Sequence, residues 1–207
     1  ATSLSVLFGD ENQAPDIQVD PDLDLIALPY SSGTTGHPKG VMLSHSNLVS
    51  NLFQFQDLEP IGAEDTLIAV LPFYHIYGMT VILNSALSHG ASVICMPRFD
   101  MVQFLDLMQL YEVTRAHLVP PIVLALAKHP LIEKYHFPKL KTIMSGAAPL
   151  SSELAEDCAR RLGCTVKQGY GLTETSPVTH INPDPPGRVV SGSIGICIPN
   201  TECRIVN

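Results

Sequence analysis

Short apolar runs alternate with helical stretches through most of this chain, and the alternation limits the folds that it can adopt. The clearest runs, which are typical of buried strands, are TLIAVLP, ASVICMP, AHLVP and KTIMSG. Apolar spacing predicts helices over 46–56, 76–87, 101–111, 121–128 and 151–162. Strands that helical crossovers separate pair in parallel. We therefore expect an α/β fold, with a parallel or mixed sheet that helices flank.

The helix predicted over 151–162 has the most distinct ends. Ser151 or Ser152 can cap it, because a serine hydroxyl accepts a hydrogen bond from the first turn. Gly163 can end it, since glycine adopts the left-handed conformation without strain. Asp100 has the same capping chemistry before the helix that follows it.

The composition of the chain changes along its length and suggests three parts. Residues 1–24 are acidic and poor in apolar side chains, so we expect an exposed N-terminal segment. The α/β core is expected over 25–185. The glycine-rich runs GSIGICIP and ECRIV predict the start of a β-rich subdomain over 186–207, in a separate layer. That subdomain is expected to be truncated, because the chain stops on the strand-like run RIVN.

Charge and hydropathy exclude two classes of protein. A net charge of −8 without a basic run argues against nucleic-acid binding through phosphate contacts. A local nest of backbone N–H groups can still bind a small anion. There is no transmembrane segment, since no apolar stretch approaches 18 residues. The five cysteines lack a C-x-x-C pair, which favours free thiols in a soluble, intracellular protein.

The loop SSGTTGHPKG, residues 31–40, contains the side chains and glycines that a phosphate site needs. Its glycines allow successive N–H groups to turn toward one anion, and Lys39 adds a positive charge. Composition alone leaves a plain flexible loop as an equal alternative. The spacing is not that of a P-loop phosphotransferase, because Lys39 precedes Gly40 and Val41 follows.

Three further segments carry candidate functional residues. In QGYGLTETSPV, glycines flank Tyr170, so its ring can cover a flat ligand, and Glu174 is an oxygen ligand suited to Mg²⁺. LPFYHIYGM contains His75, and SGAAPL offers small residues against a planar ring. The alternative for QGYGLTETSPV is a tight turn, and the alternative for His75 is a histidine with its hydrogen bonds satisfied in the core or at the surface. The alternative for SGAAPL is a strand-to-helix turn.

Taken together, YSSGTTGHPKGVMLSHSN, LPFYHIYGM, SGAAPLS and QGYGLTETSPV resemble the adenylate-forming superfamily in order and separation. This superfamily includes acyl-CoA synthetases, 4-coumarate–CoA ligases, firefly-type luciferases and the adenylation domains of peptide synthetases. The motif details are most similar to the 4-coumarate–CoA ligase and luciferase-like branch. The resemblance runs from about Asp20 to the end of the chain.

The resemblance implies ATP-dependent activation of a carboxylic acid to an acyl-adenylate, with release of pyrophosphate, and then thioester formation with CoA. It implies catalytic roles for His75, Thr173, Glu174 and Lys39, with Glu174 as the Mg²⁺ ligand. The implied nucleotide-binding residues are Ser31, Ser32, Gly33, Thr34, Thr35, Gly36, Lys39, Gly146, Ala147, Ala148, Gln168, Gly169, Tyr170, Gly171 and Thr173. The implied pocket for a flat or medium-sized apolar acid contains Tyr77, Gly146, Gly171, Pro177 and Val178.

The chain departs from the superfamily pattern because it stops before the downstream Tyr-x-Thr-Gly-Asp motif and the C-terminal domain with the catalytic lysine. The isolated chain is therefore expected to bind ATP weakly or to be inactive. The alternatives are a luciferase-like or fatty-acyl-CoA synthetase, and a non-catalytic nucleotide-binding scaffold. A P-loop phosphotransferase is a third, disfavoured alternative. The expected partners are the acid, ATP and CoA, in the cytoplasm or peroxisome.

Overall fold

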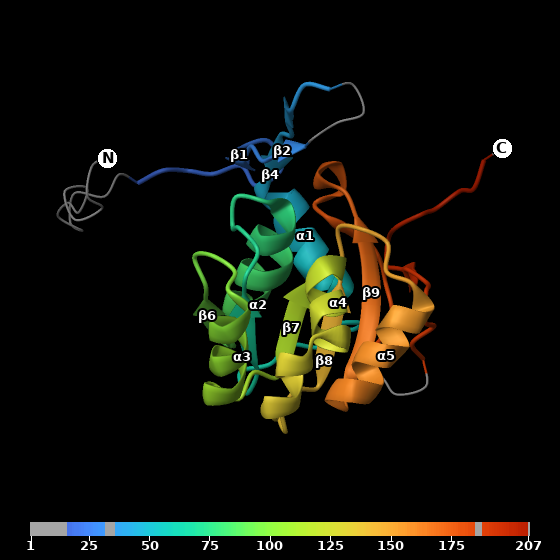
Figure 1. Cartoon of the computed structure of the whole chain (residues 1–207). Coiled ribbons are helices and arrows are strands. Elements are labelled where there is room, and N and C mark those ends of the chain that lie inside the picture. Colours follow the sequence, from blue (N-terminus) through green and yellow to red (C-terminus); the bar gives the residue numbers. More distant parts are fainter. Residues whose placement is uncertain (1–15, 32–35, 185–187, 207) are drawn as a thin grey trace.

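The computed structural model describes residues 16–31, 36–184 and 188–206. A seven-stranded sheet is its largest element (Figure 1). The strands are β5 (Thr66–Ala69), β6 (Ser92–Cys95), β7 (Arg115–Leu118), β8 (Thr142–Ser145), β9 (Thr165–Gly171), β10 (Val178–Ile181) and β11 (Ile196–Cys197). Their spatial order is β11-β10-β9-β8-β7-β5-β6. The strands from β6 to β9 pair in parallel, whereas β10 and β11 are antiparallel. The predicted α/β fold with a mixed sheet is confirmed.

Helices cover both faces of the sheet. They are α1 (His45–Gln56), the π-helix η3 (Tyr77–Asn84), α2 (Ser85–Ser88), α3 (Met101–Leu110), α4 (Pro120–Lys128), η4 (Pro130–Lys134), α5 (Ser152–Leu162) and η5 (Thr173–Thr175). Alternate side chains of a strand point to opposite faces. Ile143 accordingly packs in the core beneath α3, α4 and α5, while Met144 packs on the side of α1 and η3. The result is a three-layer arrangement.

The predicted helix ends are confirmed where local chemistry sets them. Ser151 caps α5 by accepting a hydrogen bond from the Leu154 N–H, and Gly163 ends it with a φ of 68°. Asp100 caps α3 by accepting from the Gln103 N–H. The helix predicted over 76–87 forms as η3 followed by α2.

Two small antiparallel sheets of two strands each lie beyond the carboxyl ends of the parallel strands (Figure 1). Their strands are β1 (Leu25–Ala27), β2 (Tyr30–Ser31), β3 (Lys39–Gly40) and β4 (Leu43–Ser44). β1 pairs with β4, and β2 pairs with β3. These two small sheets, of which β2–β3 is a hairpin, therefore bring residues 25–44 to the same end of the main sheet as the loops that follow β5, β8 and β9.

The expectation of a separate layer after residue 185 is wrong for β11. This strand pairs with β10, with Ile181 opposite Ile196, and so extends the main sheet. The outer edge of β10 has backbone groups that need partners, which β11 supplies. The run ECRIV, which was expected to be a strand, forms no regular element over 202–206. A domain boundary at residue 186 stays a prediction, because 185–187 lie outside the described residues.

Among the residues that the structure describes, no helix is both long enough and apolar enough to cross a membrane.

A group of buried charges lies at the amino ends of the parallel strands. The ammonium of Lys167 in β9 is fully buried, contacts the carboxylates of Glu59 and Asp184, and donates to the Leu58 carbonyl at 2.9 Å. Arg115 in β7 binds the same two carboxylates at 3.0 and 2.7 Å. Burial alone would raise the pKa of Glu59, but the charge of Lys167, with His117 and Arg115, holds it well below its usual range.

Arg115 extends this network to a third carboxylate. Its Nε lies 3.2 Å from Asp65 Oδ2, and Lys141 Nζ lies 2.7 Å from Asp65 Oδ1. The Thr114 hydroxyl also donates to Asp65, at 2.7 Å. The three carboxylates thus face three cations, and the loop before β5 is tied to β7, to the residue before β8 and to β9.

We expect Lys167→Met to lower the free energy of unfolding by about 3–5 kcal/mol, because Glu59 and Asp184 would keep Arg115 but lose the buried ammonium that pairs with both. Urea unfolding of the full-length protein measures the change. Lys128→Met is the matched control, since Lys128 pairs with Asp157 at the surface and is largely exposed. Equal effects of the two substitutions would contradict a structural role for the buried ammonium.

We also expect stability to fall in acid because of Glu59. Its pKa is lowered on folding, so its contribution is present above the ordinary value of 4.5 and is lost as pH falls toward the lowered value. Unfolding free energies measured at about pH 7 and about pH 3.5 should differ less in Glu59→Gln than in the unmodified protein. An unchanged difference would show that other groups set the acid sensitivity.

Candidate active site

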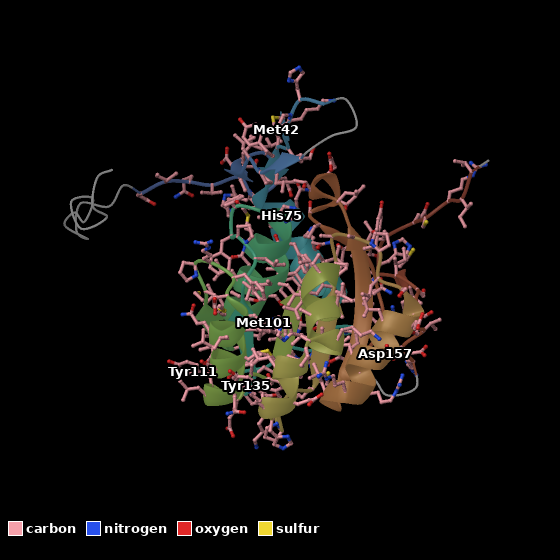
Figure 2. All side chains as sticks on the ribbon, viewed as in Figure 1. Met42, His75, Met101, Tyr111, Tyr135 and Asp157 are labelled. Atoms are coloured by element: carbon pink, nitrogen blue, oxygen red, sulfur yellow. The ribbon has the colours of Figure 1, made fainter. Side chains whose placement is uncertain are left out.

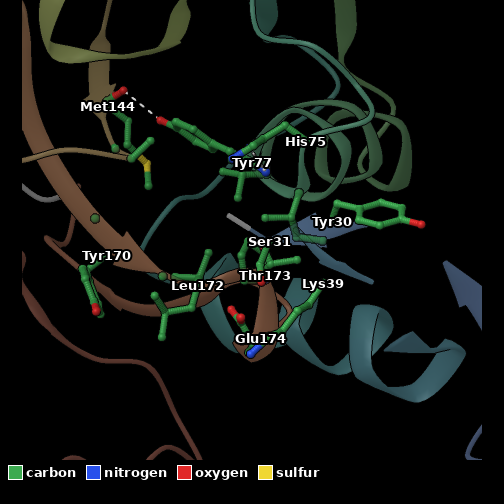
Figure 3. Close-up of a pocket in the computed structure, with 18 residues that line it drawn as sticks. Tyr30, Ser31, Lys39, His75, Tyr77, Met144, Tyr170, Leu172, Thr173 and Glu174 are labelled. Atoms are coloured by element: carbon green, nitrogen blue, oxygen red, sulfur yellow. Dashed lines mark hydrogen bonds between the residues drawn. The ribbon is translucent and has the colours of Figure 1, made fainter. Parts of the chain in front are cut away.

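A cavity of about 700 Å³ opens at the carboxyl ends of the parallel strands. This end of an open α/β sheet is where crevices form, because the loops there diverge from neighbouring strands. Figure 3 shows the side chains that line it. They come from the β2–β3 hairpin, the segment from His75 into η3, the loop after β8, and the stretch from β9 through η5 into β10.

Most of the predicted site residues line this one cavity. They are Ser31, Lys39, His75, Tyr77, Gly146, Ala147, Gly169, Tyr170, Gly171, Thr173, Glu174, Pro177 and Val178. Ser32, Gly33, Thr34 and Thr35 lie outside the described residues. Gly36, Ala148 and Gln168 are described but do not line the cavity. The Gln168 side chain instead bonds the backbone of Leu150, accepting at 2.9 Å and donating at 3.0 Å.

The β2–β3 hairpin carries the positive charge of the cavity wall. Ser31 lies opposite Lys39 in this hairpin, so their side chains reach the cavity from adjacent strands. Ser31 is buried, and Lys39 is exposed with its ammonium beside Glu174 (Figure 3). The hairpin thus presents a hydroxyl and a mobile cation to the same space.

Glu174 follows Thr173 at the start of η5, the short helix after β9. The Ser31 hydroxyl, the backbone N–H of Glu174 itself and the charge of Lys39 hold the pKa of this carboxyl below its usual range. Glu174 is therefore an ionised, solvent-accessible carboxylate. Thr173 is buried and still lines the cavity.

The turn from β9 into β10 requires glycine. A Cβ on Gly171 would lie 2.2 Å from the carbonyl oxygen of Pro177, a distance that a methyl group cannot occupy. Tyr170, the neighbour of Gly171, lies at the rim, where the residue is 46% exposed. The ring meets His180 edge-on, with centroids 6.3 Å apart. One face of Tyr170 is consequently available to a ligand in the cavity.

His75 lies near the hairpin end of the molecule and is exposed (Figure 2). Its Nδ1 accepts a hydrogen bond from the Tyr77 N–H at 3.2 Å. That bond occupies the Nδ1 lone pair, so the proton of the neutral ring belongs on Nε2. His75 is thereby arranged as a donor at the cavity wall.

Tyr77 forms the buried floor of the cavity. Its hydroxyl donates to the Met144 carbonyl at 3.1 Å, the dashed line in Figure 3. Burial raises the pKa of Tyr77 well above its usual range, and the charge of Glu59 adds to the effect. A Cβ on Gly146 would lie 3.1 Å from the Tyr77 ring, so the glycine lets the ring pack against the strand end. The floor is flat, aromatic and uncharged.

Sequence reasoning missed one group beneath this floor. His117 in β7 is fully buried, with Nε2 3.3 Å from Glu59 Oε1. Its ring meets Tyr77 edge-on at a centroid distance of 6.4 Å. His117 thus links the buried charges to the cavity. The available signal was a histidine inside the apolar run AHLVP.

Comparison with known proteins identifies relatives along the whole chain. A family model described as AMP-binding enzyme matches residues 3–207. The 4-coumarate–CoA ligase 1 of Solanum tuberosum is 45% identical over 211 residues, which cover 98% of this chain and 38% of that protein. The chain thus spans well under half the length of the curated relatives it matches.

Solved structures of other proteins also resemble this chain. ATP-bound MatB from Rhodopseudomonas palustris has a TM-score of 0.79 and 36% identity, over 88% of this chain and 35% of that one. A long-chain-fatty-acid–CoA ligase from Archaeoglobus fulgidus has a TM-score of 0.78 and 27% identity, over 88% and 38% of the two chains. With a match from residue 3 to residue 207, this chain belongs to the AMP-binding enzyme family.

Proposed function

We propose that the full-length protein activates a carboxylic acid with ATP, forming an acyl-adenylate and pyrophosphate, and then transfers the acyl group to CoA. One observation carries the proposal. Lys39, His75 and Glu174 come from separate parts of the sequence and line a single cavity with an aromatic floor. A cation, a hydrogen-bond donor and an ionised carboxylate around one space suit transfer of a nucleotidyl group to an apolar acid.

In this proposal the nucleotide lies between the hairpin and the end of β9. Lys39 neutralises the phosphates that leave as pyrophosphate, and Thr173 donates to the α-phosphate. Tyr170 covers one face of the adenine, while Gly146 and Ala147 line the opposite wall. The ATP-bound state of MatB, a structural neighbour at 36% identity, supports ATP as the substrate.

In this reaction the protein forms no covalent bond with the substrates, and its main contribution is to position the acid and ATP. A carboxylate oxygen of the acid attacks the α-phosphorus and forms a new P–O bond. The bond from the α-phosphorus to the oxygen that bridges it to the β-phosphorus breaks, and pyrophosphate leaves with the electron pair. His75 orients the attacking carboxylate by donating from Nε2. In the second half-reaction the CoA sulfur attacks the acyl carbon, AMP leaves, and the thiol proton is released.

Glu174 fits a magnesium ion that accompanies the phosphates. Mg²⁺ prefers oxygen ligands and uses one or two carboxylates beside phosphate oxygens. Glu174 has an exposed carboxylate with a lowered pKa, faces the cavity, and lies beside Lys39. A bound Mg²⁺ would neutralise charge on the phosphate oxygens.

The acid is proposed to be flat and aromatic, of the cinnamate type. Its ring would lie on the floor formed by Tyr77, with Gly146, Pro177 and Val178 around it. The potato relative, named as a 4-coumarate–CoA ligase, supports this class of acid and CoA as the acceptor. A long fatty acid is the second candidate, which the 27% identical archaeal neighbour favours by its name.

We expect Glu174→Gln to reduce Mg²⁺-dependent pyrophosphate release by roughly tenfold or more, because the amide cannot offer an anionic oxygen to the ion. Pyrophosphate formation is followed at several Mg²⁺ concentrations. Glu156→Gln on the exposed side of α5 is the matched control and should leave the rate unchanged. If Glu174→Gln keeps the same Mg²⁺ dependence, Glu174 is not the ligand.

The proposed chemistry also predicts the products and the preferred acid. With a panel of acids, ATP and CoA, the full-length protein should form AMP and should turn over cinnamate-type acids faster than long fatty acids. Chromatography of the nucleotides and thioesters measures both. ADP as the product would contradict adenylate formation, whereas turnover of fatty acids alone would overturn the aromatic-acid proposal and leave adenylation intact.

A further inference from the structure

Two thiols and one imidazole meet at the β10–β11 edge of the sheet, away from the cavity. His180 in β10 lies directly opposite Cys197 in β11, so the two side chains share a face of the sheet. Cys197 Sγ is 3.1 Å from His180 Nε2. The chain then returns Cys203 to the same point, and the three ligand atoms all lie within 4.8 Å of one another. Cys197 and Cys203 are both free thiols.

The hydrogen bonds around His180 Nδ1 determine its tautomer, and so determine that Nε2 faces the thiols as an acceptor. The Thr179 hydroxyl donates its single proton to the Tyr170 carbonyl at 3.2 Å. Its oxygen, 3.0 Å from His180 Nδ1, must then accept from the Nδ1–H. The Nε2 lone pair is left directed toward Cys197. Histidines that bind metals have this same outer hydrogen bond from the second ring nitrogen.

We propose that Cys197, Cys203 and His180 bind a zinc ion, with water as the fourth ligand. Sulfur and imidazole nitrogen are the ligands that Zn²⁺ selects in tetrahedral sites. Zinc–ligand bonds of about 2.0–2.3 Å put tetrahedral ligand atoms about 3.5–3.8 Å apart. The three atoms lie within 4.8 Å of one another, so Cys203 needs a shift of at most about 1 Å, and a few tenths of an ångström open the 3.1 Å Cys197–His180 contact to this spacing.

The exposure of the three groups leaves room for the ion and its water. His180 and Cys197 are partly buried, and Cys203 is exposed. Binding converts two thiols to thiolates and releases two protons, so the two negative charges balance the Zn²⁺. A site with three protein ligands and an accessible fourth position results.

The metal would hold the end of the described chain against the sheet. Residues 201–206 form no helix or strand, and in Figure 1 the chain after β11 leaves the sheet as an extended red ribbon. Cys203 belongs to this stretch, whereas His180 and Cys197 belong to paired strands. Zinc would therefore fasten an otherwise unsupported segment to the outer edge of the sheet.

The test is a zinc titration of the reduced, metal-free full-length protein, with competition from a coloured chelator and native mass spectrometry as readouts. Neither readout depends on enzymatic activity. We expect Cys203→Ser to weaken the affinity of one zinc site by about 100-fold or more, and Thr179→Val to weaken it by about 10–100-fold. Co²⁺ in place of Zn²⁺ should give thiolate charge-transfer absorption, which Cys203→Ser should weaken because one of the two thiolates is lost.

Cys95→Ser is the matched control, because Cys95 is an exposed thiol on β6, at the opposite edge of the sheet. It should leave zinc affinity unchanged. Cys203 is exposed, so its substitution should preserve folding, which circular dichroism of the metal-free protein verifies. Equal zinc binding by the unmodified protein and Cys203→Ser would overturn the proposal. A Cys197–Cys203 disulfide in the protein as isolated, with no zinc bound after its reduction, would also overturn it.

Discussion

Lys167 places an ammonium group in the interior of the protein, where an isolated charge would be far too costly to keep. The carboxylates of Glu59 and Asp184 pair with this ammonium and offset the cost of its desolvation. Arg115, in β7, binds the same two carboxylates. These groups belong to the loop before β5, to β7 and β9, and to the segment after β10. Their ion pairs connect β7 and β9 to the loop before β5 at the amino end of the sheet, and the cavity-lining loops extend from the other end of these same strands.

The two ends of the sheet differ in how their charged groups are arranged. The amino end neutralises its charges internally, whereas the carboxyl end keeps Lys39, His75 and Glu174 accessible around a cavity. His117 connects the ends, since it lies between Glu59 and the ring of Tyr77. The cavity floor is therefore supported by a charged network and still presents an uncharged aromatic surface. In the proposed function, a flat apolar group would lie on this floor, beside the exposed side chains proposed to contact the phosphates.

The β10–β11 edge adds a third region with its own chemistry. β10 continues the strand turn that contains Gly171 and Tyr170, and β11 follows on its outer side. The Thr179 hydroxyl connects β10 to β9 by donating to the Tyr170 carbonyl, and its oxygen faces His180. A metal held by His180 and the two thiols would act on β10, the strand that pairs with β9 beside Tyr170. The protein thus combines an α/β core with a sheet edge at which His180, Cys197 and Cys203 meet.

The sequence by itself determined the features that depend on neighbouring residues. The alternation of apolar runs and helices predicted the α/β class, Ser151 and Asp100 predicted helix starts, and four motifs predicted residues that line one cavity. Tertiary structure decided which distant residues meet. No local sequence pattern predicts that Lys167 donates a hydrogen bond to the Leu58 carbonyl, 109 residues away. None predicts the contact between His180 and Cys197 either. The wrong expectation for β11 has the same origin, because strand pairing depends on which sheet edge is open and not on the composition of the strand.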